Sequence, residues 1–258
     1  MGEQVQGDEE NIRRAAALIR SLQGGVVLTG AGISTPSGIP DFRSAGSGLW
    51  TRYDPMEVAS LSAFRYHPER FFTWLRPLAQ QMFQASPNPA HLALARLESA
   101  GYLDLVITQN IDGLHQKAGS THVVEIHGSF RTLTCIGCFQ QYQADDFIEA
   151  FLEQGVIPRC KKCQQVLKPD VILFEEQLPV HAWQIAQNAV RRCRYMLVAG
   201  SSLEVTPAAN LPYEAVEHSA RLILVNQTKT YIDQRADVLI SGDVAVILPR
   251  LADEVLNG

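Results

Sequence analysis

The run Val26-Val27-Leu28-Thr29-Gly30-Ala31-Gly32-Ile33-Ser34 decides the fold, because a short apolar run typical of a strand leads directly into a glycine-rich turn. A strand that ends in Gly-Ala-Gly predicts bare backbone N–H groups, with no side chain to block an approaching pyrophosphate. The dinucleotide-binding fingerprint is only half present, however. Its third glycine would fall at Thr35, and the acidic residue expected about 20 residues later is missing. We therefore expect a nucleotide site whose chemistry is not ordinary hydride transfer.

The composition is that of a globular protein. The 258 residues are 46% apolar and 19% charged, which is enough to bury a full core. We find no run of ~18 apolar residues and no signal or transit peptide pattern, so we expect no membrane partner. A formal net charge of −5 argues against a nucleic-acid partner and leaves a basic peptide substrate open. Four of the five cysteines have metal-like spacing, which fits a reducing cytoplasm.

Apolar runs alternate with helical patterns, which predicts an α/β fold: a Rossmann-like parallel sheet with helices on both faces. In such sheets ligands bind at the carboxyl ends of the strands, and Gly30, Gln109, Gly200 and Asn226 each directly follow a predicted strand. Each could be an ordinary turn residue, but together they favour a site. The predicted strands are 26–29, 105–108, 123–125, 171–174, 196–199, 222–225 and 238–240, and the predicted helices are 9–22, 68–83, 90–100, 181–192, 210–219 and 245–256.

Two segments interrupt this alternation. Residues 45–64 are predicted to include a mobile loop that covers a cofactor, and residues 135–168 look like an inserted metal module. We predict that residues 1–258 form a single domain with two parts. The large, Rossmann-like part covers approximately 9–34, 100–128 and 170–258. The small part covers approximately 35–99 and 129–169.

Two Cys-x-x-Cys pairs predict a zinc site. Cys135 and Cys138 form the first pair, and Cys160 and Cys163 the second, with the 21 residues 139–159 between them. This loop is slightly longer than the ~15–20 residues of the usual four-cysteine pattern. Four thiolates would close a tetrahedral zinc site without an open position, so its role would be structural. Disulfides or a redox pair are the alternatives. Cys193, which is not part of either pair, is interpreted as a core residue.

Four blocks of the sequence resemble, in the same order, those of the sirtuins, which are NAD-consuming protein lysine deacylases. Gly30-Ala31-Gly32-Ile33-Ser34 with Gly38-Ile39-Pro40-Asp41-Phe42-Arg43 is the first block. Thr108-Gln109-Asn110-Ile111-Asp112-Gly113-Leu114-His115 is the second, Glu125-Ile126-His127-Gly128 the third, and the two cysteine pairs the fourth. The chain is thereby identified as similar to a bacterial-type catalytic core of the Sir2-like family, from about Gly25 to its last residues.

This resemblance implies a reaction in which acyl-lysine and NAD meet in a tunnel between two domains. The acyl oxygen displaces nicotinamide from the ribose, and a histidine then acts as general base on a ribose hydroxyl. Lysine and O-acyl-ADP-ribose are released, and nicotinamide is a product and an expected inhibitor. His127 matches the base, and an imidazole that titrates near neutral pH suits that task. The alternative for a single histidine is a structural role, which we assign to His67, His91, His122, His181 and His218; His115 receives no catalytic role.

The resemblance also implies the residues that bind NAD. Asn110 and Asp112 match residues around the nicotinamide and its ribose, so with His127 they form the implied catalytic set. Asp112 could instead be a simple turn former. The implied NAD contacts are Gly30, Ala31, Gly32, Ser34, Asp41, Phe42, Arg43, Gln109, Asn110, Ile111, Asp112, His127, Gly200, Ser201, Ser202, Asn226, Gln227 and Val244.

Two segments, residues 171–174 and 202–205, match those that clamp an extended acyl-lysine peptide in the family. Strand addition of this kind gives affinity through main-chain hydrogen bonds. Glu175 stands where the common family pattern Phe-Gly-Glu has glycine, and its carboxylate predicts a preference for basic residues near the target lysine. The implied substrate contacts are Val171, Leu173, Phe174, Leu203, Glu204 and Val205.

The acyl group removed is predicted from the helix that begins at Pro68. The family branch that removes succinyl groups carries a Tyr and an Arg three residues apart there, and the alignment puts Leu75 and Leu78 in those places. Two leucines cannot neutralise a buried carboxylate. We therefore expect acetyl and other uncharged acyl groups to be preferred, unless a shift of one residue turns Arg76 toward the pocket.

Other functions remain open from the sequence. Mono-ADP-ribosyl transfer would use the same activated ribose with another nucleophile. A non-enzymatic zinc-ribbon module is disfavoured by the complete set of residues 109–112 and His127 and by the absence of a basic patch. An NAD dehydrogenase is disfavoured by the broken glycine fingerprint.

Overall fold

The structure of the chain is a computed structural model that describes residues 2–44, 46 and 48–258. Contacts within the chain divide it into two compact units. The large unit comprises the residues up to Ser37, Ser86–Ile126 and Val180–Gly258, and the small unit comprises Gly38–Ala85 and His127–Pro179. Among the described residues, no helix is both long and apolar enough to cross a membrane.

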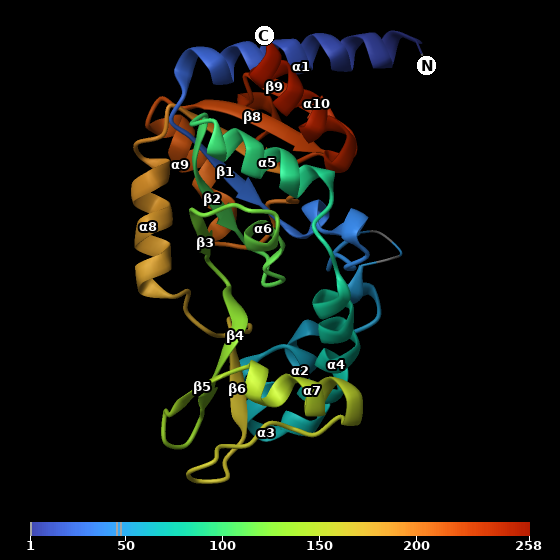
Figure 1. The fold of residues 1–258 in the computed structure, drawn as a ribbon, viewed down its shortest axis with the longest axis vertical. Coiled ribbons are helices and arrows are strands. Elements are labelled where there is room, and N and C mark those ends of the chain that lie inside the picture. Colours follow the sequence, from blue (N-terminus) through green and yellow to red (C-terminus); the bar gives the residue numbers. More distant parts are fainter. Residues whose placement is uncertain (1, 45, 47) are drawn as a thin grey trace. The chain divides into compact units, whose positions relative to one another are not determined.

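A six-stranded sheet of parallel strands in the order β3-β2-β1-β7-β8-β9 forms the large unit (Figure 1). Counted within the sheet alone, this is the 3-2-1-4-5-6 order of dinucleotide-binding folds, whose ligands bind where the order reverses, here between β1 and β7. The α/β prediction is therefore confirmed. The strands are β1 (Gly25–Thr29), β2 (Leu103–Thr108), β3 (Val123–Glu125), β7 (Tyr195–Ala199), β8 (Arg221–Asn226) and β9 (Val238–Ser241).

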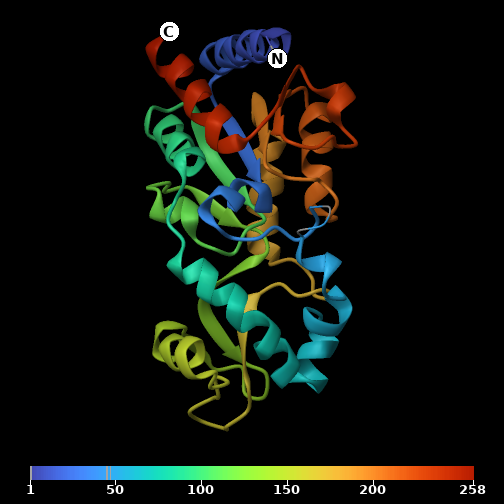
Figure 2. The same cartoon turned by 90° about the vertical axis from the view of Figure 1, so that its right-hand side faces the viewer.

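Helices cover both faces of this sheet because neighbouring residues of each buried strand point to opposite sides. In β1, Val27 packs into a core with α1, α5 and α10, whereas Val26 and Leu28 pack into a second core with α8 and α9. Helices α1 and α10 also contact each other near the C-terminus (Figure 2). Glu9 and Arg250 form an ion pair of 2.9 Å between them. The helices of this unit are α1 (Gly2–Leu22), α5 (Pro89–Ser99), α6 (Leu114–Lys117), α8 (Val180–Val190), α9 (Leu211–Glu217) and α10 (Val244–Asn257).

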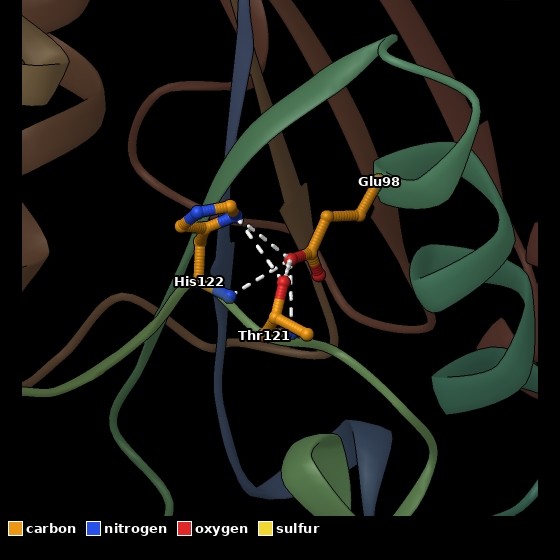
Figure 3. Close-up of polar contacts among 3 residues, drawn as sticks. All are labelled: Glu98, Thr121 and His122. Atoms are coloured by element: carbon orange, nitrogen blue, oxygen red, sulfur yellow. Dashed lines mark hydrogen bonds and ion pairs between the residues drawn. The ribbon is translucent and has the colours of Figure 1, made fainter.

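A carboxylate near the end of α5 anchors the loop that leads into β3. Oε1 of Glu98 accepts hydrogen bonds from the backbone N–H groups of Thr121 and His122, at 2.9 and 2.8 Å, and from the Thr121 hydroxyl at 2.7 Å (Figure 3). Burial alone would raise the pKa of Glu98, but these hydrogen bonds outweigh it and lower the pKa below its ordinary value. These hydrogen bonds fix the loop that leads into β3, the strand at the edge of the sheet.

Among its described residues, the small unit combines a three-stranded antiparallel sheet, in the order β5-β4-β6, with four helices. The predicted strand 171–174 of the large sheet is wrong, because β6 ends at Val171 and belongs to the small sheet. An apolar run of this kind can be buried in either the large or the small sheet, so the sequence pattern could not distinguish the two sheets. The elements are α2 (Pro55–Val58), α3 (Leu61–Tyr66), α4 (Pro68–Gln84), β4 (Gly128–Cys135), β5 (Gln141–Gln143), α7 (Asp145–Gln154) and β6 (Leu167–Val171).

The unit boundaries differ from the predicted ones at several places. Helix α5 lies in the large unit, since its residues Ala90, Leu94 and Leu97 join the core with α10. Residues 170–179 and His127 lie in the small unit. Of the predicted covering loop, Ala45 and Ser47 lie outside the described residues, and much of the remainder forms a 3-10 turn and the helices α2 and α3.

Candidate functional site

Three loops meet at the carboxyl ends of β1, β2 and β7. The backbone N–H of Gly32 donates to the carbonyl of Gly200 at 2.9 Å. The side chain of Asn110 donates to the carbonyl of Gly30 at 3.0 Å, and Nε2 of Gln109 donates to the hydroxyl of Ser201 at 2.8 Å. The predicted convergence of these strand ends is therefore present at the point where the strand order reverses.

The glycines of this cluster allow the loops to touch. A Cβ atom on Gly30 would lie 2.9 Å from the carbonyl oxygen of Gly200, and one on Gly32 would lie 2.8 Å from it. Gly200 also has a φ of +63°, which disfavours any other residue. Several backbone N–H groups expected to be bare are instead bonded: Gly30 donates to Ala199 and Ser34 to the carbonyl of Ala31. Close packing of the loops, as well as space for a phosphate, therefore accounts for the glycines in this turn.

Ser34, Asn110 and Asp112 form a compact polar network. The hydroxyl of Ser34, which is 1% exposed, donates to Oδ2 of Asp112 at 2.7 Å and accepts from Nδ2 of Asn110 at 3.0 Å. Oδ1 of Asp112 accepts from the backbone N–H of Leu114 at 2.9 Å. Asp112 thus forms the turn and also orients Ser34, and its contact with the nicotinamide stays a prediction. A hydroxyl, an amide and a carboxylate together suit ribose hydroxyls and a carboxamide.

A buried histidine pair beneath this network was not predicted. The rings of His91 and His115 are 4.9 Å apart, and Nε2 of His115 lies 2.9 Å from the hydroxyl of Thr29. Burial lowers the pKa of His115 to about 3, with a smaller contribution from His91. Burial lowers the pKa of His91 to about 4, partly offset by Asp112. Both rings are therefore neutral at pH 7. No local pattern marks such a pair, because α5 brings His91 from a distant segment.

Other residues that the resemblance implies as NAD contacts differ in what they bind within the chain. The amide of Asn226 accepts from Ser201 N–H at 2.9 Å and donates to the Ser201 carbonyl at 3.1 Å, so it braces the loop after β7. Gln227 is exposed, and Ser202 is half-buried. Val244 is buried at the first residue of α10, which Asp243 caps by accepting from the N–H of Ala245 at 2.8 Å.

In the small unit, Asp41, Phe42 and Arg43 form a self-supporting turn. Oδ1 of Asp41 accepts from the N–H groups of Arg43 and Ser44, at 2.9 and 2.7 Å. The ring of Phe42 lies 5.1 Å from that of Trp50, which stacks on Trp74 at 5.9 Å. Trp50 also meets Phe174 at 5.9 Å, edge to face. Trp50 and Trp74 were not predicted, since lone aromatic residues carry no spacing signal.

His127 lies directly before β4 and is half-buried. Its carbonyl accepts from the N–H of Ile172 at 2.8 Å. Gly128 has a φ of +75°, and a Cβ atom there would lie 2.0 Å from the carbonyl oxygen of Asp170. Only glycine fits at this position, and the resulting close approach fixes the backbone on which His127 stands.

The predicted peptide contacts fall in different units. Val171 and Leu173 are buried in the small unit, and Phe174 pairs with the backbone of the α2–α3 junction through Ala59 and Leu61. Leu203, Glu204 and Val205 belong to the large unit, where Leu203 is buried with a φ of +55°.

Four cysteines gather beside the small sheet. The Sγ atoms of Cys135, Cys138, Cys160 and Cys163 all lie within 4.8 Å of one another, and none of the four forms a disulfide. Backbone N–H groups of Gly137 and Lys162 point at the sulfurs of Cys135 and Cys160, at 3.4 Å each, as suits thiolate ligands. The four thiols are thus positioned to bind one zinc ion in tetrahedral geometry. Cys193 lies in the core of the large unit.

Comparison with known proteins places this α/β nucleotide-site protein in a family. Residues 30–207 match the profile of the Sir2 family. The chain is 46% identical to the NAD-dependent protein deacylase 2 of Archaeoglobus fulgidus, over 96% of this chain and 97% of that protein. A solved structure of a Sir2 enzyme, which concerns the mechanism and regulation of these enzymes, is 45% identical to this chain. Its TM-score is 0.91 over 96% of this chain and 99% of the other. A second, Sir2Af2 bound to a myristoylated histone peptide, is 40% identical, with a TM-score of 0.83 over 96% of this chain and 98% of the other. The chain belongs to the Sir2 family.

Proposed function

We propose that the chain is an NAD-dependent protein lysine deacylase that removes acetyl and other uncharged acyl groups and yields nicotinamide, O-acyl-ADP-ribose and free lysine. The observation that carries the proposal is the network of Ser34, Asn110 and Asp112 at the strand ends of a Sir2-family chain. The Archaeoglobus relative is named an NAD-dependent protein deacylase, and solved relatives bind myristoylated and propionylated peptides.

The residues of the network fit NAD. Bound NAD supplies a ribose carbon from which nicotinamide can leave. The side-chain oxygen of Asn110 can accept from a ribose hydroxyl, and the carboxylate of Asp112 can accept from the carboxamide. The bonds from Asn110 and Leu114 hold these groups in place before the ligand arrives, which lowers the cost of ordering them.

His127 supplies the general base. It accepts a proton from a ribose hydroxyl at an imidazole nitrogen. Its backbone is fixed by the bond from Ile172 and by the close approach at Gly128.

Helix α4 supports the preference for uncharged acyl groups. Leu75 and Leu78 are buried, at 2% and 5% exposure. Arg76 donates from Nε to the carbonyl of Leu152 at 3.0 Å and from Nη2 to that of Glu153 at 2.7 Å. Its cation is thus held at the C-terminus of α7, where the helix dipole favours it. The arrangement supports the alignment that puts the leucines at the acyl pocket.

We further propose a cytoplasmic enzyme that nicotinamide inhibits and that binds no nucleic acid. The four-thiol zinc site requires reduced cysteines, which supports a reducing compartment. A net charge of −5 supports a peptide substrate over a nucleic acid.

Mass spectrometry of an acetyl-lysine peptide, incubated with the protein with and without NAD, tests the proposal. We expect loss of the acetyl group only with NAD, together with one O-acetyl-ADP-ribose for each lysine released. Deacetylation without that product would contradict the mechanism. ADP-ribose attached to the protein or peptide, with the acetyl group retained, would identify a mono-ADP-ribosyltransferase instead.

A further inference from the structure

Glu175 has a backbone conformation that favours glycine. Its φ is +73°, in the left-handed region, where an L side chain is strained. The residue stands where the common family pattern has glycine, and it adopts a conformation that favours glycine while it carries a carboxylate. A strained residue persists only where its surroundings hold it.

The carboxylate of Glu175 caps helix α3. Its Oε2 accepts from the backbone N–H of Ser62 at 2.9 Å. The first N–H groups of a helix have no partner within the helix, and here each of the first three has one outside it. The N–H of Leu61 donates to the carbonyl of Phe174 at 3.0 Å, and that of Ala63 to the hydroxyl of Ser60 at 2.9 Å. Two of the three acceptors therefore come from residues 174 and 175.

Charge supports the same contact. The hydrogen bonds from Ser62 lower the pKa of Glu175, and the nearby Arg65 adds to this effect. The carboxylate is therefore ionised at neutral pH, as the positive end of the helix dipole favours.

Glu176 also holds residues 173–176 in place, through different partners. Oε2 of Glu176 accepts from the N–H of Leu173 at 2.9 Å and pairs with Nζ of Lys168 at 3.0 Å. Phe174 also donates its N–H to the carbonyl of Ala59 at 3.0 Å. Residues 173–176 are thus tied on several sides, and Glu175 provides the link to Ser62.

We propose that Glu175 is a positioning residue for the acyl-lysine peptide. Its carboxylate ties the segment of Leu173 and Phe174 to the start of α3 and fixes the backbone with which the peptide pairs. This inference rests on the proposed function. Because the carboxylate is bound within the chain, the expected attraction of basic residues in the substrate is replaced by this internal contact.

The test measures binding of a labelled acetyl-lysine peptide by fluorescence anisotropy and steady-state kinetics on the same peptide. Glu175→Ala removes the contact and keeps the strain, Glu175→Gly removes both, and Glu175→Gln keeps an acceptor without charge. We expect the Ala and Gly variants to raise the peptide Kd and KM roughly tenfold, with kcat and the KM for NAD nearly unchanged. The Gln variant should fall between them and the wild type. Glu149→Ala, an exposed acid of the same unit, is the matched control and should leave the peptide KM unchanged.

Three outcomes would overturn the inference. Wild-type peptide binding in Glu175→Ala would remove the positioning role, as would an equal rise in the KM for NAD. A rise confined to peptides with Lys or Arg beside the target would mean that the carboxylate contacts substrate directly. The proposed function fails separately if the wild type binds the peptide and does not deacylate it with NAD. If the wild type neither binds nor deacylates the peptide, both proposals fail.

Discussion

At the scale of single residues, Asp112 performs two tasks with its two oxygens. Oδ1 closes the turn before α6 by accepting from Leu114, and Oδ2 orients the hydroxyl of Ser34. A carboxylate can do this because it accepts several hydrogen bonds at once. The turn is the role that the Asn-Ile-Asp-Gly pattern predicts, whereas only the geometry shows the contact with Ser34.

The residue-scale prediction concerns His127. We expect His127→Ala to lower kcat/KM for deacylation by ~10²–10⁴-fold, because a general base is lost. The thermal unfolding midpoint should stay close to that of the wild type, since the backbone there is fixed by Gly128 and Ile172. His181→Ala, an exposed histidine of α8, is the control. A His127→Ala variant that keeps most of its activity would remove this residue from the mechanism.

At the scale of elements, α4 separates its polar and apolar residues. Leu75 and Leu78 are buried, while Arg76 and Gln80 donate to the last carbonyls of α7. The helical repeat places residues 75 and 78 on one side and 76 on another. Under the proposed alignment, these two leucines stand where the succinyl-removing branch carries Tyr and Arg.

The prediction for α4 concerns acyl selectivity. One peptide carrying acetyl, butyryl or succinyl lysine should be deacylated with a kcat/KM at least about tenfold higher for acetyl than for succinyl, because an unpaired buried carboxylate is costly. Arg76→Gln should leave this ratio unchanged. If succinyl removal matched acetyl removal and Arg76→Gln abolished it, Arg76 would face the acyl chain.

The prediction for the cysteine cluster concerns folding. The purified chain should contain one zinc, and Cys163→Ser or chelation should remove it and reduce activity, because thiolate ligands contribute folding free energy directly. Metal analysis and circular dichroism measure both effects. Cys193→Ala should retain the zinc, since that thiol lies in the other unit. Full activity and an unchanged fold after complete chelation would contradict a structural zinc.

At the scale of the whole molecule, the sheet brings distant residues together and excludes water from them. His91 and His115 come from α5 and α6, and Thr29, bonded to His115, from β1. Ring nitrogens Nε2 of His91 and Nδ1 of His115 have no hydrogen-bond partner among the described residues. Protonating either ring would bury a charge, which explains the lowered pKa values.

This pair predicts how stability depends on pH. Both pKa values lie below the ordinary value of 6.5, so from about pH 6.5 downward the unfolded chain takes up protons that the folded chain does not. The folded state therefore loses stability as the pH falls from 6.5 toward 4, and the effect vanishes above pH 7. Urea unfolding of His115→Gln should show a loss between pH 7 and pH 5 that is smaller than in the wild type by about 2 kcal/mol. His181→Gln should follow the wild type, and an equal loss in His115→Gln would exclude the buried ring as the cause.

The sequence by itself determined the α/β class, most strands of the parallel sheet and the cysteine cluster. Alternating apolar periods specify buried strands and helices, and Cys-x-x-Cys spacing places sulfurs locally. These are short-range properties, so they can be read from neighbouring residues. The sequence did not show which sheet the 171–174 run joins or which unit contains α5, because an apolar run fits any buried environment.

Only the tertiary structure decided how the residues of the candidate site are used. The packing of Gly30 and Gly32 against Gly200, the histidine pair and the cap that Glu175 places on α3 each join residues from separate segments. The energy of such contacts depends on distance, burial and hydrogen-bond direction, none of which is encoded in local spacing. For the same reason, the direction of the Arg76 side chain became clear only from its hydrogen-bond partners at the end of α7.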